Sequence, residues 1–246
     1  MARSSRYHQA DYAADYDHDR FGGGFGAGME QDEVALYLRL LAGCKGPVLD
    51  AGCGTGKLSL PLLAGHLQTV SADLSPEMLS QARAKAGAAG LNLSGLLADI
   101  RALAFRDRSF AACVSSRALM HVPDWRRGLA ELCRVTGDLL IFDIPPTWSS
   151  SGLDALRRRL EDRRPGHSGH PYHTFTAREV TRELRQHGFE VLEQHRAFFL
   201  PVAFHRRLER PALSRRLERI FSAMGLTHFL GAPVTLKARR RPPAAG

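Results

Sequence analysis

The residues with the clearest chemical use in this sequence lie in VLDAGCGTG, at positions 48–56. Three glycines alternate after Asp50: Gly52, Gly54 and Gly56. The dinucleotide fingerprint G-x-G-x-x-G needs another glycine where this chain has Lys57, and that fingerprint binds a pyrophosphate. Because the Asp50 carboxylate would repel a pyrophosphate and attract a cation, we expect this turn to hold an amino-acid ammonium group.

Further polar side chains follow the next three apolar segments. Asp73 ends QTVSADL, 21 residues after Gly52, and an acidic side chain at that spacing binds ribose hydroxyls. Asp99 and Ile100 end LNLSGLLADI, where a carboxylate suits an exocyclic amine and an aliphatic side chain suits a purine face. Ser115 and Ser116 end SFAACVSS. An adenosine joined to an amino acid would meet all of these groups, and S-adenosylmethionine (SAM) is the common metabolite of that shape.

The elements that must position these groups alternate between short strands and helices. We expect strands in GPVLDAG, QTVSADL, LNLSGLLAD, SFAACVSS, DLLIFDIPP, FEVLEQHRAFFL and GAPVTLKARR. Helices are expected at 29–42, in GKLSLPLLAGH, after the Ser75 N-cap, in DWRRGLAELCRV, in FTAREVTRELRQHGF and within 201–230. Short connections between alternating strands and helices favour a doubly wound α/β fold with helices on both faces of the sheet. In such a sheet the ligand lies beyond the carboxyl ends of the strands, where the groups above occur.

Four segments, VLDAGCGTG, SADLSPEML, LLADIRALAF and FAACVSSRALMHV, resemble the successive motifs of the class I SAM-dependent methyltransferases. The nearest group contains the quinone-biosynthesis methyltransferases and the biotin-pathway carboxyl methyltransferase. The resemblance covers about residues 45–145 and implies a Rossmann-like, mostly parallel seven-stranded sheet with SAM as cofactor. It implies cofactor contacts from Asp50, Gly52, Cys53, Gly54, Gly56, Asp73, Leu74, Asp99, Ile100, Ser115 and Ser116, and from Tyr16 and Arg20 in an N-terminal arm.

The resemblance implies methyl transfer by in-line displacement, and we expect a small-molecule acceptor. His121, in ALMHVPDW, is the candidate base or substrate contact, with a structural histidine as the alternative. A nucleic-acid methyltransferase and a non-catalytic SAM-binding protein remain alternatives. Nucleic acid is the less favoured acceptor, because SSRA replaces the polar-Pro-Pro-aromatic motif of base-amine methyltransferases after the fourth strand. A nicotinamide oxidoreductase is the least favoured alternative, because Asp50 and Lys57 both depart from its fingerprint.

The domain plan follows from composition and the motifs. We expect a flexible arm at 1–28, one methyltransferase domain at 29–240 and a disordered tail at 241–246. The cofactor-binding core is placed at 45–146, and two insertions, 147–174 and 201–230, are expected to form a lid over the acceptor. Within the second insertion, PALSRRLERIFSAMGL predicts an amphipathic helix that packs on the core or lies on an anionic membrane.

Charge and cysteine content restrict the partners. Residues 1–146 carry 15 Lys and Arg against 16 Asp and Glu, whereas residues 147–246 carry 19 against 9. This basic C-terminal part is compatible with an anionic or lipid-linked acceptor and with peripheral membrane contact. Four isolated cysteines, no spanning segment and no secretory signal predict a cytoplasmic protein with reduced thiols. The repeat of His167, His170 and His173 is assigned to a lid loop, and no metal is expected.

Overall fold

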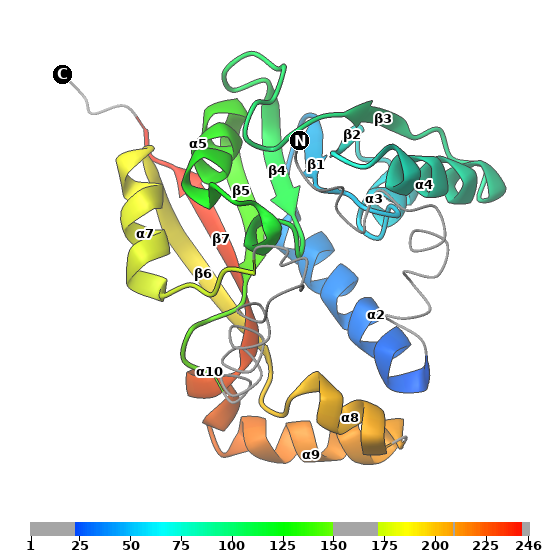
Figure 1. Cartoon of the computed structure of the whole chain (residues 1–246), viewed down its shortest axis with the longest axis vertical. Coiled ribbons are helices and arrows are strands. Elements are labelled where there is room, and N and C mark those ends of the chain that lie inside the picture. The colour runs from blue at the N-terminus through cyan, green and yellow to red at the C-terminus, as the bar shows by residue number, and fades with distance from the viewer. Residues whose placement is uncertain (1–22, 150–171, 209, 243–246) are drawn as a thin grey trace, which may run out of the picture.

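A computed structural model describes residues 23–149, 172–208 and 210–242. One seven-stranded sheet organises them, with the strand order β3-β2-β1-β4-β5-β7-β6. The strands are β1 (Val48–Ala51), β2 (Thr69–Asp73), β3 (Ser94–Leu97), β4 (Phe110–Ser115), β5 (Thr136–Ile144), β6 (Phe189–Phe198) and β7 (Ala232–Arg240). Strands β1 to β5 pair in parallel, and β7 runs antiparallel to both of its neighbours. The expected doubly wound, mostly parallel fold is therefore confirmed (Figure 1).

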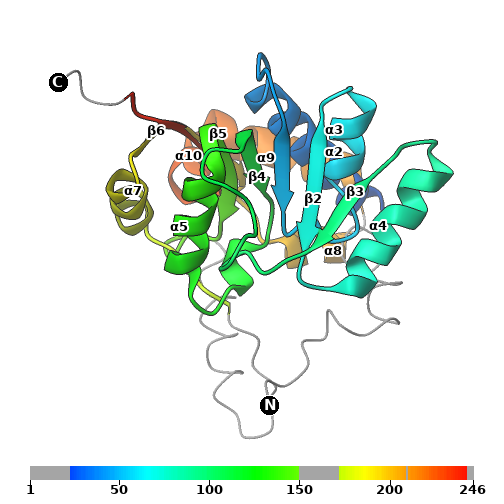
Figure 2. The same cartoon turned by 90° about the horizontal axis from the view of Figure 1, so that it is seen from above.

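Helices surround this sheet. They are α2 (Gly23–Leu40), α3 (Ser59–Ala64), α4 (Pro76–Ala88), the short 3-10 helix η2 (Leu119–His121), α5 (Trp125–Val135), α7 (Ala177–Gln186), α8 (Val202–Leu208), α9 (Pro211–Ala223) and α10 (Leu226–Leu230). Ser75 caps α4 by accepting a hydrogen bond from the Met78 N–H at 3.1 Å, as its position before Pro76 predicts. Figure 2 shows the helices on both sides of the strands.

Alternate side chains of the central strands divide the core into two layers. Ala112 and Val114 of β4 pack with α2 and α3, whereas Cys113 between them packs with α5 and α7. Strand β5 follows the same rule, with Leu139 and Ile141 in the first layer and Leu140, Phe142 and Ile144 in the second. Successive side chains of a strand point to opposite faces, so two covered faces require the near-continuous apolar runs of this sequence.

Two boundaries differ from those expected. Helix α2 begins at Gly23, so residues 23–28, which we expected in the arm, are helical. Gly28 faces α9 there, and a Cβ on it would lie 3.6 Å from the Arg215 guanidinium. Strand β5 begins at Thr136, directly after α5, whereas the expected strand DLLIFDIPP begins at Asp138. The pairing register of β4 with β5 shifts between Phe110 and Ala112, next to this short connection.

The winding of the sheet reverses between β1 and β4. The carboxyl ends of these two strands therefore border the crevice where a doubly wound sheet binds its ligand. In Figure 1, α2 lies below these strand ends, and α8 and α9 lie further down. Tyr16, Arg20, His167, His170 and the tail from 243 lie outside the described residues.

Candidate functional site

The glycine turn after β1 is built from backbone conformations that favour glycine. Gly52, Gly54 and Gly56 have φ of 75°, 55° and 88°. A Cβ at Gly52 would lie 2.4 Å from the Ala118 Cβ, and one at Gly56 would lie 2.4 Å from the Leu60 Cδ1. A Cβ at Gly54 would meet nothing within 4 Å. The Ala118 Cβ therefore leaves no room for a side chain at Gly52, and a Cβ at Gly56 would force the Leu60 side chain to shift. Gly54 presents open backbone to a ligand.

Asp73, at the end of β2, binds this turn directly. Its Oδ2 accepts the Gly54 N–H at 2.8 Å, and its Oδ1 accepts the Ser75 N–H at 2.9 Å. The next side chain, Leu74, is 53% exposed although it is apolar. The Asp73 carboxylate is fixed by two backbone donors beside the open Gly54, so it provides an acceptor for hydroxyl groups. The exposed Leu74 side chain provides an apolar surface for a ring.

Asp50 faces the interior. The residue is buried, its Oδ2 accepts the Ser59 hydroxyl at 2.6 Å, and Ser59 accepts the Ser71 hydroxyl at 2.7 Å. Burial raises the pKa of Asp50 to about 6. These bonds join the first residue of α3 to β1 and β2, so Asp50 supports the turn from below. Its expected contact with an ammonium group stays a prediction.

The Cys53 thiol is also buried, and burial raises its pKa well above the usual value. A nucleophilic cysteine needs an accessible thiolate, so the geometry makes Cys53 a small side chain in the turn. Its expected contact with the cofactor stays a prediction. All four cysteines are free.

Asp99 and Ile100 follow β3. Arg101 binds Asp99 through its backbone N–H at 2.8 Å and through its guanidinium at 2.6 Å, and these hydrogen bonds lower the pKa of Asp99. Ile100 is 8% exposed, and its Cδ1 would lie 3.3 Å from a Cβ on Gly52. Asp99 therefore already has a cationic partner, and Ile100 forms the wall behind the glycine turn.

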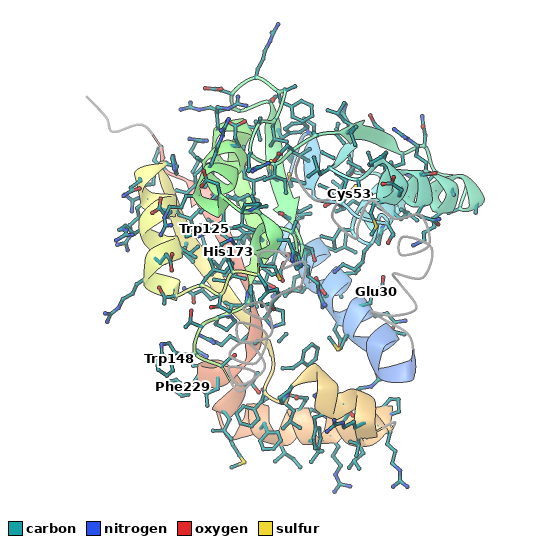
Figure 3. The ribbon with its side chains drawn as sticks, in the orientation of Figure 1. Glu30, Cys53, Trp125, Trp148, His173 and Phe229 are labelled. Carbon is teal, nitrogen blue, oxygen red and sulfur yellow. The ribbon has the colours of Figure 1, made fainter. Side chains whose placement is uncertain are left out.

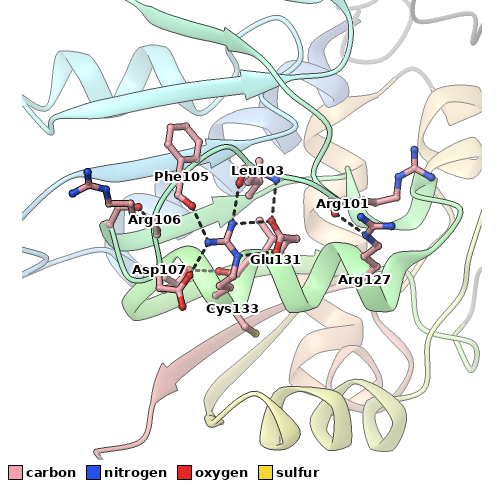
Figure 4. Close-up of polar contacts among 12 residues, drawn as sticks. Arg101, Leu103, Phe105, Arg106, Asp107, Arg127, Glu131 and Cys133 are labelled. Carbon is pink, nitrogen blue, oxygen red and sulfur yellow. Dashed lines mark hydrogen bonds and ion pairs between the residues drawn. The ribbon is translucent and has the colours of Figure 1, made fainter.

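The loop that follows Asp99 is held by Arg134 of α5. Figure 4 shows the hydrogen bonds around Leu103, Phe105, Asp107 and Glu131. Arg134 donates to the carbonyl oxygens of Leu103 and Phe105 at 2.9 and 2.8 Å and to Asp107 at 2.8 Å, while Glu131 accepts the Leu103 N–H at 2.9 Å. The loop thus has a fixed path, which positions Asp99 and Ile100.

The two serines at the end of β4 have different partners. Ser115 is buried, and its hydroxyl donates to the Ala51 carbonyl oxygen at 2.8 Å, which ties β4 to β1. Ser116 instead joins a cluster of charged side chains, where its hydroxyl donates to Glu33 at 2.5 Å and accepts from Lys57 at 2.9 Å. The geometry gives Ser115 a structural role, and its expected cofactor contact stays a prediction.

This cluster was not predicted from the sequence. Glu33 of α2 pairs with the Lys57 Nζ at 2.7 Å and with the Arg117 guanidinium at 2.7 Å. The Glu33 side chain is 11% exposed. Burial alone would raise its pKa, but Arg117 and Lys57 outweigh burial and lower that pKa to about 2. We name Glu33, Lys57, Ser116, Arg117 and Asp143 the charged cluster.

Asp143 of β5 completes the charged cluster. Its Oδ1 accepts the Arg117 N–H at 2.5 Å, and Arg117 has a φ of 54°. Its Oδ2 is buried and has no hydrogen-bond partner among the residues that the structure describes. Burial, together with the charge of Glu33, raises the pKa of Asp143 to about 6. A buried oxygen without a donor at a strand end is available to a donor on a bound molecule.

His121 is the last residue of η2 and lies four residues after Arg117 of the charged cluster. Its ring lies 5.7 Å from the Tyr172 ring, and the His173 N–H donates to the Met120 carbonyl oxygen at 2.9 Å. Phe175 pairs with Pro146 and packs on Trp125 at 5.0 Å between ring centroids. Residues 172–175 are therefore fixed against the His121 segment, so His173 is anchored there rather than in a solvated loop. No cluster of metal-ligating side chains occurs within the described parts of the chain.

The alternating glycines allow a test of the open face. We expect Gly54→Ala to cost about 1 kcal/mol of stability through its positive φ, and to lower SAM affinity at least about tenfold by filling the open face. Gly56→Ala should be destabilised by about 2–3 kcal/mol, because its clash with Leu60 adds to the same backbone cost. Chemical unfolding and calorimetric titration measure both effects.

Gly87→Ala is the matched control, since a Cβ there meets nothing within 4 Å and Gly87 lies inside α4. It should leave SAM affinity unchanged and should not destabilise the fold. If Gly54→Ala bound SAM as tightly as the wild type, the face over Gly54 would not be the cofactor surface.

Comparison with known proteins agrees with this geometry. Residues 48–138 match the family described as "Methyltransferase domain". A demethylmenaquinone methyltransferase from Thermus thermophilus is 38% identical over 127 residues, which cover 50% of this chain and 57% of that protein. The chain thus matches just over half the length of this relative.

Solved structures share the fold. Magnesium protoporphyrin IX methyltransferase from Synechocystis PCC 6803, solved with bound S-adenosylhomocysteine (SAH), superposes with a TM-score of 0.64 at 19% identity, over 94% of this chain and 98% of that chain. A SAM-dependent methyltransferase from Methanosarcina mazei superposes with a TM-score of 0.62 at 21% identity, over 84% and 98% of the two chains.

The sheet order, the glycine turn and the strand-end acids define a methyltransferase domain with a Rossmann-like fold. Residues 48–138 form a methyltransferase domain, as the motifs of this segment predict, and the fold is shared with SAM-dependent methyltransferases of known structure. The magnesium protoporphyrin IX methyltransferase of this fold was solved with bound SAH and with bound SAM. In the described part of the chain, no helix is both long and apolar enough to span a membrane.

Proposed function

We propose that this protein transfers a methyl group from SAM to a small-molecule acceptor. One observation carries the proposal. At the carboxyl ends of β1 and β2, Asp73 accepts the Gly54 N–H, and no side chain in the described part of the chain covers Gly54. The match of residues 48–138 to methyltransferase domains supports it.

Six of the expected cofactor residues then have a role that their geometry suits. Asp73 accepts the ribose hydroxyls, the Gly54 backbone lies under the methionine part, and Leu74 covers the adenine. Asp99 accepts from the adenine amine while it stays paired with Arg101, and Ile100 packs behind it. Asp50 and Ser59 hold the turn in the shape that these contacts need.

When bound, SAM supplies an activated methyl group, whose bond to sulfur breaks as the bond to the acceptor forms, with the electron pair remaining on sulfur. The protein must align the acceptor with that methyl group and exclude water. Where the acceptor is a hydroxyl group or an acidic carbon, His121 takes its proton. Asp143 offers its second carboxylate oxygen to a donor on the acceptor and so fixes the acceptor's orientation.

The proposed acceptor class is a ring compound with a hydroxyl group or an acidic ring carbon. The Thermus thermophilus relative, named for a menaquinone precursor, supports a quinone-type ring. The His121 and Tyr172 rings are aromatic surfaces against which such a ring would stack.

The test uses SAM labelled on its methyl group and the full chain. The protein is incubated with separate small-metabolite, lipid, nucleic-acid and protein fractions of cells. We expect label in the small-metabolite or lipid fraction and formation of SAH, both absent without the protein. Label confined to nucleic acid or protein would overturn the acceptor class. SAM binding without transfer to any fraction would indicate a non-catalytic binding protein.

A further inference from the structure

Helices α8 to α10 form a layer outside the matched methyltransferase segment, which ends at residue 138. The inner side of α9 is fixed by Glu218, which accepts the Phe199 and Leu200 N–H groups at 2.8 and 2.9 Å and contacts the buried His205 ring at 2.9 Å. Phe221 packs on Phe199 with ring centroids 4.6 Å apart. These contacts determine which side of α9 faces outward.

The outward side of this layer exposes large apolar side chains. Leu213, Ile220 and Met224, which belong to the apolar side of the amphipathic helix that the sequence predicts, are 37%, 47% and 66% exposed. In α10, Phe229 and Leu230 are 70% and 38% exposed. Single exposed apolar residues are ordinary, but five between residues 213 and 230, in α9, in α10 and at Met224 directly after α9, indicate an interaction surface. We name these five residues the apolar patch.

Trp148, just after β5, is 81% exposed. In the view of Figure 3, Trp148 and Phe229 project from the same edge of the molecule. Tryptophan is enriched where an apolar phase meets water, because its ring is apolar and its N–H is polar.

Arginines border the apolar patch. Residues 201–230 contain six arginines and two glutamates, and one of those glutamates is Glu218, which is turned inward. Arg216 lies one helical turn before Ile220 and Arg219 directly precedes it; both are exposed. Neither forms an ion pair within the part of the chain that the structure describes. The outer face therefore combines an apolar strip with an unneutralised positive strip.

We propose that the outer face of α9 and α10 docks this protein on an anionic lipid membrane. The apolar patch enters the boundary between headgroups and acyl chains, and Arg216 and Arg219 bind anionic headgroups. A second copy fits less well, because a symmetric contact would place these arginines near their own copies. Nucleic acid fits less well, because the centre of the face is apolar.

Docking would act on the site through α2. Helix α2 packs against both α8 and α9, and it carries Glu33 into the charged cluster. The membrane would then lie on the side of the molecule toward which His121 and Asp143, the proposed contacts to the methyl acceptor, face. This position suits a methyl acceptor dissolved in lipid. Membrane binding itself needs no turnover, so its test is independent of the proposed function.

Vesicle sedimentation of the full chain tests the proposal. We expect binding to phosphatidylcholine vesicles that contain phosphatidylglycerol to be at least about tenfold tighter than to pure phosphatidylcholine, and to weaken with added salt. Ile220→Asp and Met224→Asp should each reduce binding about tenfold or more, and Arg216→Glu about fivefold or more.

Two matched variants on other surfaces serve as controls. Leu97→Asp changes a leucine of β3 that is 57% exposed, and Arg178→Glu changes an exposed arginine of α7. Both should bind vesicles like the wild type, and all variants should keep the wild-type melting temperature and SAM affinity. Equal binding to both vesicle types, no binding, or equal losses in the controls would overturn the proposal. Dimerisation in solution that the patch variants abolish, without vesicle binding, would replace the membrane by a second copy.

Discussion

The Asp73→Ala variant is expected to bind SAM about a hundredfold or more weakly than the wild type. If Asp73 accepts both ribose hydroxyls, its removal deletes two charge-assisted hydrogen bonds, each of about 1.5–3 kcal/mol. About 1.4 kcal/mol corresponds to a tenfold change, so a hundredfold loss is a conservative estimate. Calorimetric titration with SAM and with SAH measures it.

Part of that loss will be structural, because Asp73 also accepts the Gly54 and Ser75 N–H groups. The unfolding free energy should fall by about 1–3 kcal/mol, which leaves a folded protein whose affinity can be measured. Asp138→Ala is the matched control, since Asp138 lies near the start of β5, away from the strand carboxyl ends, and has a 55% exposed side chain. It should bind SAM like the wild type. Affinity of Asp73→Ala within a few fold of the wild type would place the ribose elsewhere.

Much of the fold and of the cofactor side could be predicted because their signals are local in sequence. Strands buried on both faces are continuous apolar runs, and the acids that end them stand out as single polar residues in a fixed order. Asp73 shows this well. Its position after β2 alone predicts that it lies near the glycine turn, and the 2.8 Å contact with Gly54 agrees.

The partners of those acids could not be predicted in the same way. Asp50 meets Ser59 and Ser71 from different elements, and no spacing rule distinguishes that arrangement from an open carboxylate. Asp143 had a usable signal, because it is the acid nearest the end of β5, just as Asp50 and Asp73 lie at the ends of β1 and β2. Glu33 had no such signal. It is one of several acids in α2, and its partner Ser116 lies 83 residues later in the chain, so only the tertiary fold brings the two together.

The largest stability effect is expected at Glu33. Its carboxylate is the partner of Lys57 and of Arg117, whose side chains are 11% and 15% exposed. Glu33→Ala would leave two cations in a poorly hydrated site, and removal of one partner from a buried ion pair costs about 3–5 kcal/mol. Denaturant unfolding near neutral pH measures the loss. Glu179→Ala removes an exposed pair with Arg126 and should cost at most about 1 kcal/mol.

The pH dependence separates a charge effect from a packing effect. The pKa of Glu33 is lowered to about 2, so its charge stabilises the fold above the unfolded pKa of 4.5 and this contribution is lost as pH falls toward 2. The difference in unfolding free energy between wild type and Glu33→Gln should therefore be about 3 kcal/mol near neutral pH and shrink in acid.

Asp143 has the opposite pH dependence, because its pKa is raised to about 6 in the folded protein. Its contribution to stability is present below its unfolded pKa and is lost as pH rises through 6. Since the Glu33 charge contributes to that shift, Glu33→Gln should also lower the pKa of Asp143. A pH-independent difference would mean that Glu33 acts through packing alone, and the charged cluster would then not be an electrostatic unit.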